Sequence, residues 1–259
     1  MSDPAAVRRS TLAMLLTSRG FVRVADASLE LGVSEVTVRA DLSALARDGR
    51  AVRVHGGAMP VDALVRESPV ESTRDQQADA KRSIGIAAAH LVSSGDCIYL
   101  DAGSTALAIA EVLLERRELH DVIVVTSALP LALALEPGIP RFEVVVTGGT
   151  LRPLQHSLVN PFAATMLAAL RFDLAFIGCN GIHPRHGVTN VNLPEAEVKT
   201  LAVRSAQRAV LVADGSKLMR IDPAVIGGLG DFAQLVTAGE APDGAVEAVR
   251  SAGLEVLAA

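Results

Sequence analysis

A chain of 259 residues, half of them hydrophobic and a fifth charged, is long enough to form more than one packed domain. With no tryptophan and one tyrosine, the composition argues against a protein that stacks single-stranded nucleic acid on aromatic rings. Cys97 and Cys179 are too few for a disulfide framework or a zinc site, and no apolar run reaches the roughly 18 residues that a membrane span needs.

The charge is divided unevenly along the chain. The first 60 residues carry eight arginines and six acidic residues, whereas the remainder carries 16 basic and 23 acidic residues. A basic excess at one end of an acidic chain indicates a local surface that contacts phosphate groups. His183 and His186 have the spacing H-x-x-H, but no nearby cysteine or carboxylate completes a ligand set, which favours a loop. We expect no metal and no cofactor, and the lack of a signal-peptide pattern predicts a cytoplasmic protein.

Two short helices are predicted near the N-terminus. Residues 7–19 place their leucines on one stripe, which predicts a helix that Gly20 ends. A β-prone run follows at 21–24, and a small helix with Asp26 as its N-cap is expected over 26–31.

The next helix is predicted to begin after Ser34, whose hydroxyl suits an N-cap. Val38, Leu42 and Leu45 are spaced i, i+4 and i+7, so they share the buried face. The opposite face is polar and basic. Gly49 then ends the helix.

The β-prone runs 50–54 and 55–58 predict a two-stranded wing. Two short helices joined by a glycine-containing turn, the second with a polar outer face, are typical of a helix-turn-helix. Any small helical hairpin would share this spacing, but the terminal position, the arginine bias and the wing favour DNA binding. The residues expected to contact double-stranded operator DNA are Ser34, Val36, Thr37, Arg39, Ala40, Ser43, Arg47, Arg53 and His55.

A polar stretch with two prolines, residues 59–77, predicts a linker between a domain over 1–58 and a larger domain over 78–259. Beyond it, apolar strands alternate with helices, which predicts an α/β fold with a mostly parallel sheet covered on both faces. Strands are expected at 97–100, 122–125, 142–146, 173–178, 209–213, 235–238 and 254–257. Helices are expected at 78–92, 105–116, 128–135, 161–170, 194–206 and 243–252.

The turns at the carboxyl ends of these strands, where such sheets bind ligands, are small and polar. The first holds Asp101, Gly103, Ser104 and Thr105 before a helix, which suits a phosphate, although a plain helix cap would use the same residues. The other candidate ligand-binding residues are Thr126, Ser127, Gly148, Gly149, Arg152, Asn180, Glu195, Lys199 and Lys217. Arg152 suits bidentate pairing with an anion, whereas the i, i+4 pair Glu195 and Lys199 could be only a surface salt bridge. Together these turns predict an anionic ligand.

The motifs occur in a recognisable order. The N-terminal half reads Val33-Ser34-x-x-Thr37-Val38-Arg39-x-Asp41-Leu42-x-x-Leu45, then Gly49 and His55-Gly56-Gly57-Ala58. The second half carries LDAGST (100–105), VVTS (124–127), TGGTLR (147–152) with Ser157, FDLAFIGCNGI (172–182), EAEVK (195–199) and LVADGSK (211–217). In this arrangement the chain resembles the DeoR family over nearly its whole length.

The resemblance implies a repressor, or less often an activator, of a sugar catabolic operon. It also implies release from DNA by a phosphorylated sugar metabolite, a homo-oligomer, and a sensor domain similar to ribose-5-phosphate isomerase. Carried over, Gly103, Ser104 and Thr105 would hold the phosphate. The groups that would close on the rest of the ligand are Arg152, Glu195, Lys199 and Lys217.

The sequence also departs from the family pattern. Ala40 stands where the family usually has a second Arg or Lys, which removes one contact to DNA. Ala106, Ser127 and Asn160 replace a common hydroxyl residue, Asn and Gly respectively. These changes bear on which ligand binds more than on its class.

Two other functions fit a chain of this layout. A phosphosugar isomerase with an added DNA-binding domain would need a general base, and the acidic run of the isomerase is replaced here by Ile177-Gly178-Cys179-Asn180-Gly181. We therefore expect no enzyme activity. Alternatively, the α/β domain could serve mainly in assembly, which the polar turns argue against.

Overall fold

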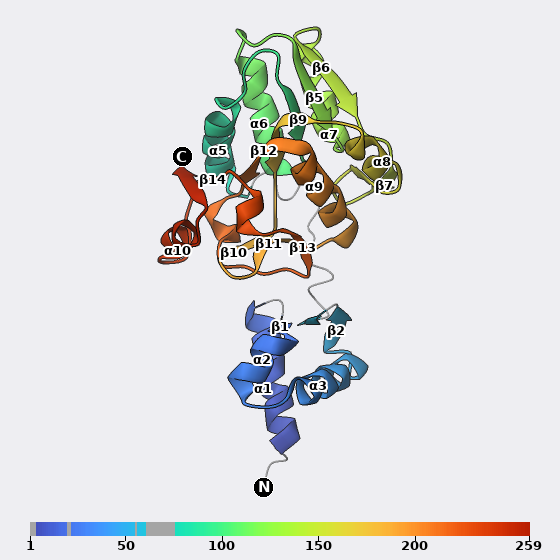
Figure 1. Ribbon diagram of the computed structural model, residues 1–259, viewed down its shortest axis with the longest axis vertical. Coiled ribbons are helices and arrows are strands. Elements are labelled where there is room, and N and C mark those ends of the chain that lie inside the picture. The colour runs from blue at the N-terminus through green and yellow to red at the C-terminus, as the bar shows by residue number, and fades with distance from the viewer. Residues whose placement is uncertain (1–3, 20–21, 55, 61–75) are drawn as a thin grey trace.

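The computed structural model describes residues 4–19, 22–54, 56–60 and 76–259. Figure 1 shows these residues as two folded bodies, a small N-terminal one and a larger one. The N-terminal body consists of α1 (Pro4–Arg19), β1 (Val22–Arg23), α2 (Val24–Leu31), α3 (Glu35–Arg47), β2 (Ala51–Val54) and β3 (Gly57–Pro60). The predicted helices are thus confirmed within a few residues at each end.

A small apolar core holds the N-terminal body together. Val38, Leu42 and Leu45 of α3 are at most 1% exposed, as their spacing predicts, and they pack with Leu12 and Leu16 of α1. Val36, Arg39, Ala40 and Arg47 on the opposite face of α3 are exposed. The helix-turn-helix arrangement therefore follows from the apolar spacing of its helices.

Two local expectations for this body were wrong. The helix α2 begins at Val24 and not after Asp26, because the chain passes directly from β1 into the helix. The Val24 N–H donates to the Gly56 carbonyl at 2.9 Å, and β1 pairs antiparallel with β3, so the wing belongs to a three-stranded sheet. His55 lies outside the described residues, as do 61–75 of the expected linker.

The larger body is an α/β domain built on a seven-stranded sheet, and every neighbouring pair of strands is parallel. The strands lie in the order β15 (Glu255–Ala258), β14 (Gln234–Thr237), β12 (Ala206–Val212), β9 (Phe172–Ile177), β4 (Cys97–Leu100), β5 (Val122–Thr126), β6 (Phe142–Val146). The helices are α5 (Ala78–Ala89), α6 (Ser104–Glu115), α7 (Leu129–Leu135), α8 (Phe162–Ala168), α9 (Leu193–Ser205) and α10 (Ala245–Ser251). The predicted parallel α/β class is confirmed.

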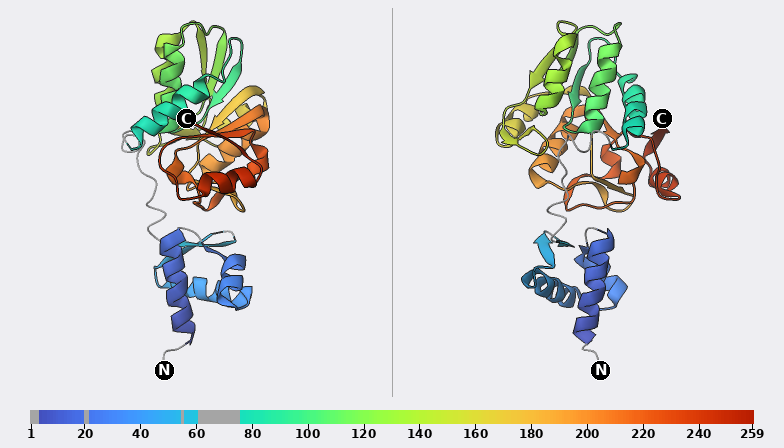
Figure 2. Two further views of the ribbon diagram at one scale, coloured as in Figure 1. Left: turned by 90° about the vertical axis from the view of Figure 1, so that its left-hand side faces the viewer. Right: turned by 180° about the vertical axis from the view of Figure 1, so that it is seen from behind.

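Alternation along the strands creates two apolar layers, one on each face of the sheet. Ile98 and Leu100 of β4 point to the layer shared with α5, α6 and α7. Tyr99, between them, points to the layer shared with α8, α9 and α10. Figure 2 shows the sheet between these two groups of helices. Burial on both faces explains why the strands read as continuous apolar runs.

Two antiparallel elements were not predicted. A hairpin of β7 (Thr150–Arg152) and β8 (Ser157–Val159) follows β6, and β10 (Gly181–His183), β11 (Gly187–Asn190) and β13 (Ala224–Gly227) form a small sheet. Strands of only three or four residues are too short to show an alternation that distinguishes them from loops.

The loop histidines lie at the end of this small sheet. The rings of His183 and His186 are 4.7 Å apart, and Nε2 of His186 lies 3.3 Å from a carboxylate oxygen of Asp26. Burial lowers the pKa of both histidines, which favours neutral rings. Among the described residues, no group of three or more His, Cys, Asp and Glu could hold a metal ion, and no helix is long and apolar enough to cross a membrane.

Candidate functional site

The predicted DNA-reading helix α3 is fixed by a cap at its N-terminus and by an ion pair at its middle. The Ser34 hydroxyl accepts the Thr37 N–H at 3.2 Å, which is the N-cap that the sequence predicts. Asp41, a buried carboxylate on the inner side, accepts from Nε of Arg8 at 2.5 Å and so connects α3 to α1. Arg8 is therefore a structural cation, although the arginine bias alone would assign it to DNA.

The outward face of α3 carries the other candidate DNA contacts. Val36 is 72% exposed, and Arg39 pairs with Glu35 at 2.6 Å on the same face. The Arg39 carbonyl accepts from the Ser43 hydroxyl at 2.7 Å and from the Arg53 guanidinium at 3.0 Å. The wing is thereby tied to the middle of α3, so that helix and wing can contact one surface together. Ala40 and Arg47 are exposed on α3 as well.

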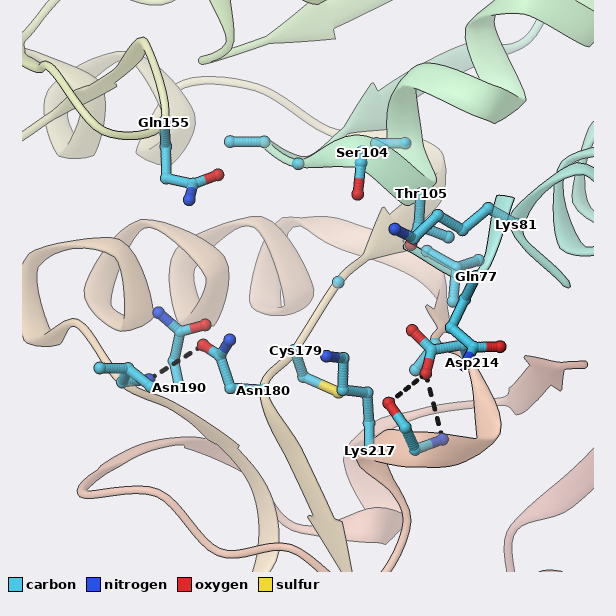
Figure 3. Close-up of a pocket in the computed structure, with 18 of the residues that line it drawn as sticks. Gln77, Lys81, Ser104, Thr105, Gln155, Cys179, Asn180, Asn190, Asp214 and Lys217 are labelled. Carbon is cyan, nitrogen blue, oxygen red and sulfur yellow. Dashed lines mark hydrogen bonds between the residues drawn. The ribbon is translucent and has the colours of Figure 1, made fainter. Parts of the chain in front are cut away.

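A cavity of about 270 Å³ lies at the carboxyl ends of β4, β9 and β12, where parallel sheets usually bind ligands. Its size is close to the lower end of the roughly 300–1,000 Å³ typical of small-molecule sites. The side chains labelled in Figure 3 come from the starts of α5 and α6, from the turn between β7 and β8, from β11 and from the turns after β9 and β12. The candidate residues that line this pocket are Gly103, Ser104, Thr105, Asn180, Glu195, Lys199 and Lys217.

The start of α6 forms one wall of the pocket. Its N-cap is Gly103, with φ of 128°, a conformation that side chains rarely adopt. No atom lies within 4 Å of where a Cβ would stand at Gly103, so the space beside the helix N-terminus is open. Ser104 and Thr105 begin the helix there. Backbone N–H groups and hydroxyls at a helix N-terminus suit an anion, and the N-cap Gly103 has no side chain with which to cap these N–H groups.

The floor of the pocket contains buried opposite charges. Nζ of Lys199 lies 2.9 Å from Oδ2 of Asp101 and donates to the Gly178 carbonyl at 3.0 Å. Burial alone would lower the pKa of Lys199, but the carboxylates of Asp101 and Glu195 outweigh it and raise the pKa above its usual value. Lys199 is thus held as a cation. Because Lys199 and Glu195 are both buried, the surface salt bridge suggested by their spacing was wrong.

Six candidate residues do not line the pocket: Asp101, Thr126, Ser127, Gly148, Gly149 and Arg152. Asp101 lies beneath it, paired with Lys199. The hydroxyls of the β5 turn bond within the protein: Thr126 accepts the Ala128 N–H at 3.1 Å, and Ser127 bonds Tyr99 at 3.1 Å.

The glycines of the TGGTLR segment serve the hairpin. A Cβ at Gly149, whose φ is 145°, would lie 2.0 Å from the Val159 carbonyl oxygen, so only glycine allows β7 and β8 to meet. A Cβ at Gly148 would lie 3.1 Å from the Phe162 side chain. Both glycines thus permit close packing rather than access for a ligand.

Arg152 likewise turns inward. Its guanidinium pairs with the Glu195 carboxylate, which also accepts from the Ser157 hydroxyl at 2.6 Å. This network joins the hairpin to the first turn of α9. Arg152 therefore orients Glu195, which itself lines the pocket.

Several lining residues were not in the candidate set: Gln76, Gln77, Lys81, Gln155, Cys179, Asn190, Asp214, Ser216 and Arg220. Cys179, Asp214 and Ser216 lie in turns that the sequence marked as polar. Gln76, Gln77 and Lys81 precede β4, the first strand of the seven-stranded sheet, and a search restricted to the ends of strands therefore misses them. A usable signal existed, since the chain has three lysines and all of them line this pocket.

Comparison with known proteins identifies both bodies of the structure. Residues 8–63 match the model of the DeoR-like helix-turn-helix domain, and residues 76–238 match that of the DeoR C terminal sensor domain. The chain is 34% identical over 252 residues to the HTH-type transcriptional regulator GlpR of Haloferax volcanii, covering 97% of each chain. It is 30% identical to the HTH-type transcriptional repressor CsqR of Escherichia coli, covering 89% of this chain and 86% of the relative.

Among solved structures, ribose 5-phosphate isomerase A from Methanocaldococcus jannaschii is similar over 55% of each chain, with 18% identity and a TM-score of 0.40. The two relatives with sequence identities of 34% and 30% are named a transcriptional regulator and a transcriptional repressor. The expectation of a regulator that binds DNA through its helix-turn-helix and carries a sensor domain is confirmed. The chain belongs to the DeoR family of transcriptional regulators.

Proposed function

We propose that this regulator is a repressor of a sugar catabolic operon and leaves its operator when a phosphorylated sugar fills the pocket at the sheet edge. The observation that carries the proposal is the pocket wall at Gly103. There an open helix N-terminus lies in one cavity with all three lysines of the chain. One relative, CsqR, is itself named a repressor.

The charges of the pocket support an anionic ligand. Lys81, Lys199, Lys217 and Arg220 line it, against the carboxylates of Glu195 and Asp214. Asp214 already accepts the backbone N–H of Ser216 at 3.1 Å, so part of its charge is directed at its own turn. A phosphate would gain charge-assisted hydrogen bonds from the cations and from the start of α6.

The polar groups opposite α6 suit the sugar hydroxyls. Gln155, Asn180 and Asn190 line that side of the pocket (Figure 3). Oδ1 of Asn180 accepts the Val191 N–H at 3.0 Å, which fixes the orientation of its amide. Fixed amides discriminate among hydroxyl arrangements, because an unmatched buried polar group is costly.

The DNA side of the proposal uses the outward face of α3 and the wing. We assign operator contact to Ser34, Val36, Thr37, Arg39, Ala40, Ser43, Arg47, Arg53 and His55. A homo-oligomer would bring two such faces to a repeated operator sequence, as helix-turn-helix dimers do. We retain the division into a DNA-binding part over 1–58, a linker over 59–77 and a sensor over 78–259, acting in the cytoplasm, with two adjustments at the boundaries. Strand β3 extends the first part to Pro60, and the pocket-lining Gln76 and Gln77 belong with the sensor.

A thermal-shift screen tests the ligand class. A panel of monosaccharide phosphates would be compared with the same sugars without phosphate, and we expect only phosphorylated members to raise the melting temperature. Thr105→Ala and Lys217→Ala should lose the shift, whereas Arg117→Ala, an exposed cation outside the lining, should keep it. The ligand that shifts the melting point should also release DNA in a gel-shift titration. Equal shifts with and without phosphate would contradict the proposal.

A further inference from the structure

Lys81 stands apart from the other cations of the pocket, because it comes from the chain just after the expected linker. It lies in the first turn of α5, and its side chain is buried, with 6% of the residue exposed. Nζ donates to the Gln76 carbonyl at 2.5 Å. In Figure 3 the Lys81 side chain extends toward Thr105 at the start of α6. Lys81 and Ser104 border this pocket together.

A ligand phosphate would compete for this ammonium group. A carbonyl oxygen is a neutral acceptor, whereas a phosphate oxygen is charged and forms a shorter and stronger hydrogen bond with an ammonium group. The wall at Gly103 to Thr105 is the place in the pocket best suited to a phosphate. An anion bound there would attract Nζ of Lys81 and weaken its bond to Gln76.

The backbone at Gln76 and Gln77 is able to respond to that loss. Gln77 is the N-cap of α5 and has φ of 54°, a left-handed conformation that is uncommon for a residue other than glycine. Such conformations persist where the surroundings hold them. The bond from Lys81 to Gln76 is one such contact, directly beside the left-handed residue.

The rest of α5 cannot follow, because it is tightly docked. A Cβ at Gly85 would lie 2.8 Å from the Ala108 carbonyl oxygen, so the backbones of α5 and α6 are in close contact. Ile84 and Ala88 of α5 are fully buried in the same layer as α6. A change at the first turn of α5 therefore has to be taken up on its N-terminal side.

We propose that Lys81 binds the anionic group of the effector together with Ser104 and Thr105, and in doing so releases the Gln76 carbonyl. Occupancy of the pocket would thus alter the backbone at residues 76–77, where the sensor begins and from which the chain leads back toward the DNA-binding domain. The inference rests on the proposed function of the pocket and adds both a ligand-binding residue and the route by which binding is transmitted.

The test compares Lys81→Gln, Lys81→Arg and the control Arg82→Gln, using inorganic phosphate and the panel of sugar phosphates as probes. Arg82 is the neighbouring cation, exposed and paired with Glu115. Calorimetric titration should give a dissociation constant about 10- to 150-fold weaker for Lys81→Gln, as for the loss of one charge-assisted hydrogen bond. Lys81→Arg should retain part of the affinity, and Arg82→Gln should bind as the wild type does.

Hydrogen exchange provides the second measurement. Phosphate should change the exchange of the backbone amides at 76 and 77 in the wild type and in Arg82→Gln, but not in Lys81→Gln. Circular dichroism establishes that each variant is folded. If Lys81→Gln does not fold, Lys81→Arg must show weakened binding and a smaller exchange response, and wild-type values for both would overturn the inference.

The outcomes separate the two proposals. If the wild type binds neither phosphate nor any sugar phosphate, the proposed function fails and this inference fails with it. If the wild type binds and Lys81→Gln binds equally well, the inference alone is overturned. Equal weakening in Lys81→Gln and Arg82→Gln would show a general effect of charge, and would likewise overturn a direct contact by Lys81.

Discussion

The outward face of α3 and the pocket both present positive charge, yet α3 presents arginines in water whereas the pocket encloses lysines. On α3, the Arg39 side chain is about half exposed and pairs with an equally accessible Glu35. In the pocket, Lys199 is 4% exposed and pairs with Asp101, which is 1% exposed. An exposed pair contributes about 0–1 kcal/mol to stability. A buried pair is costly to break, because its partner is left as an unpaired charge.

This difference in burial predicts whether the loss of a cation affects DNA binding or the stability of the fold. Removing a cation from α3 should change contact with DNA and leave folding intact. Removing a cation from the pocket floor should change folding before it changes ligand binding. Surface charge is thus available to a partner, whereas buried charge is already committed within the fold.

The largest expected effect is at the pocket floor. Lys199→Ala leaves the Asp101 carboxylate buried without its cation, and should lower the free energy of unfolding by roughly 3–5 kcal/mol. Chemical denaturation followed by circular dichroism measures the change. In the double variant Asp101→Asn with Lys199→Met, both charges are absent and much of the loss should be recovered. If Lys199→Ala unfolds at the same denaturant concentration as the wild type, the buried pair does not stabilise the fold more than the exposed pair on α3 does.

The second prediction concerns the thiol among the pocket cations. Burial raises the pKa of Cys179 to about 12, although Lys199 and Lys217 oppose the rise. A thiol with this pKa is ionised to about one part in ten thousand at pH 8, and only the thiolate reacts with iodoacetamide. Alkylation of Cys179, followed by mass spectrometry, should be roughly a thousand-fold slower than that of N-acetylcysteine.

The pH dependence distinguishes ionisation from access. The rate of alkylation at Cys179 should rise about tenfold per pH unit from 7 to 9 without levelling. Because the folded-state pKa is raised, the thiol stabilises the fold below its unfolded pKa, and this contribution is lost as the pH rises toward 12. A rate that reaches a plateau below pH 9 would mean that the pocket cations outweigh burial.

The third prediction concerns α3. Arg39→Ala should weaken binding to a DNA fragment selected by the wild type about tenfold or more, and should reduce the slope of log affinity against log salt by about 0.9. Fluorescence anisotropy at several salt concentrations gives both quantities. Arg117→Ala removes the same charge from the sensor and serves as the control. If the slope of log affinity against log salt is unchanged in Arg39→Ala, the Arg39 side chain does not contact the DNA phosphates.

The smallest effect is expected at the cap of the same helix. Ser34→Ala removes the acceptor for the Thr37 N–H and should destabilise α3 by about 1 kcal/mol. Hydrogen exchange of the Leu42 and Leu45 amides should accelerate about fivefold. Ser34→Gly should cost only a few tenths of a kcal/mol, because glycine is tolerated at this position. Equal acceleration in both variants would contradict the cap.

The parts of the fold that could be predicted are those with a long apolar period. Val38, Leu42 and Leu45 fixed the buried side of α3, and the apolar runs at 97–100 and 142–146 gave β4 and β6 with the bounds observed. The hairpin at β7 and β8 could not be found in the same way. It depends on the contact of Gly149 with Val159, which no local periodicity records.

Most of the residues that were predicted correctly for the site follow a strand of the sheet, and the exceptions are Glu195 and Lys199 of α9. Ser104 and Thr105 were found because they come after β4, but the same reasoning overstated Thr126, whose hydroxyl is used by its own turn. Arg152 was predicted to bind the ligand because the sequence does not show that its guanidinium pairs with Glu195, which is distant in the chain. Lys81 was missed because it precedes β4, the first strand of the seven-stranded sheet. The spacing of motifs does not predict which side chains pair across long separations in the sequence.

Because all three lysines line one pocket, chemistry that is specific for lysine side chains acts only at that pocket. Arginines make up the other 21 basic side chains, so a reagent or endoproteinase that acts on lysine side chains meets this chain only at 81, 199 and 217. Because Lys81 and Lys199 are buried, cleavage after them in the native protein would report opening of the effector pocket. Lys217 is the least buried of the three, so amine coupling to a sensor chip through a lysine would attach the molecule at the pocket, and binding measurements on such chips need another attachment.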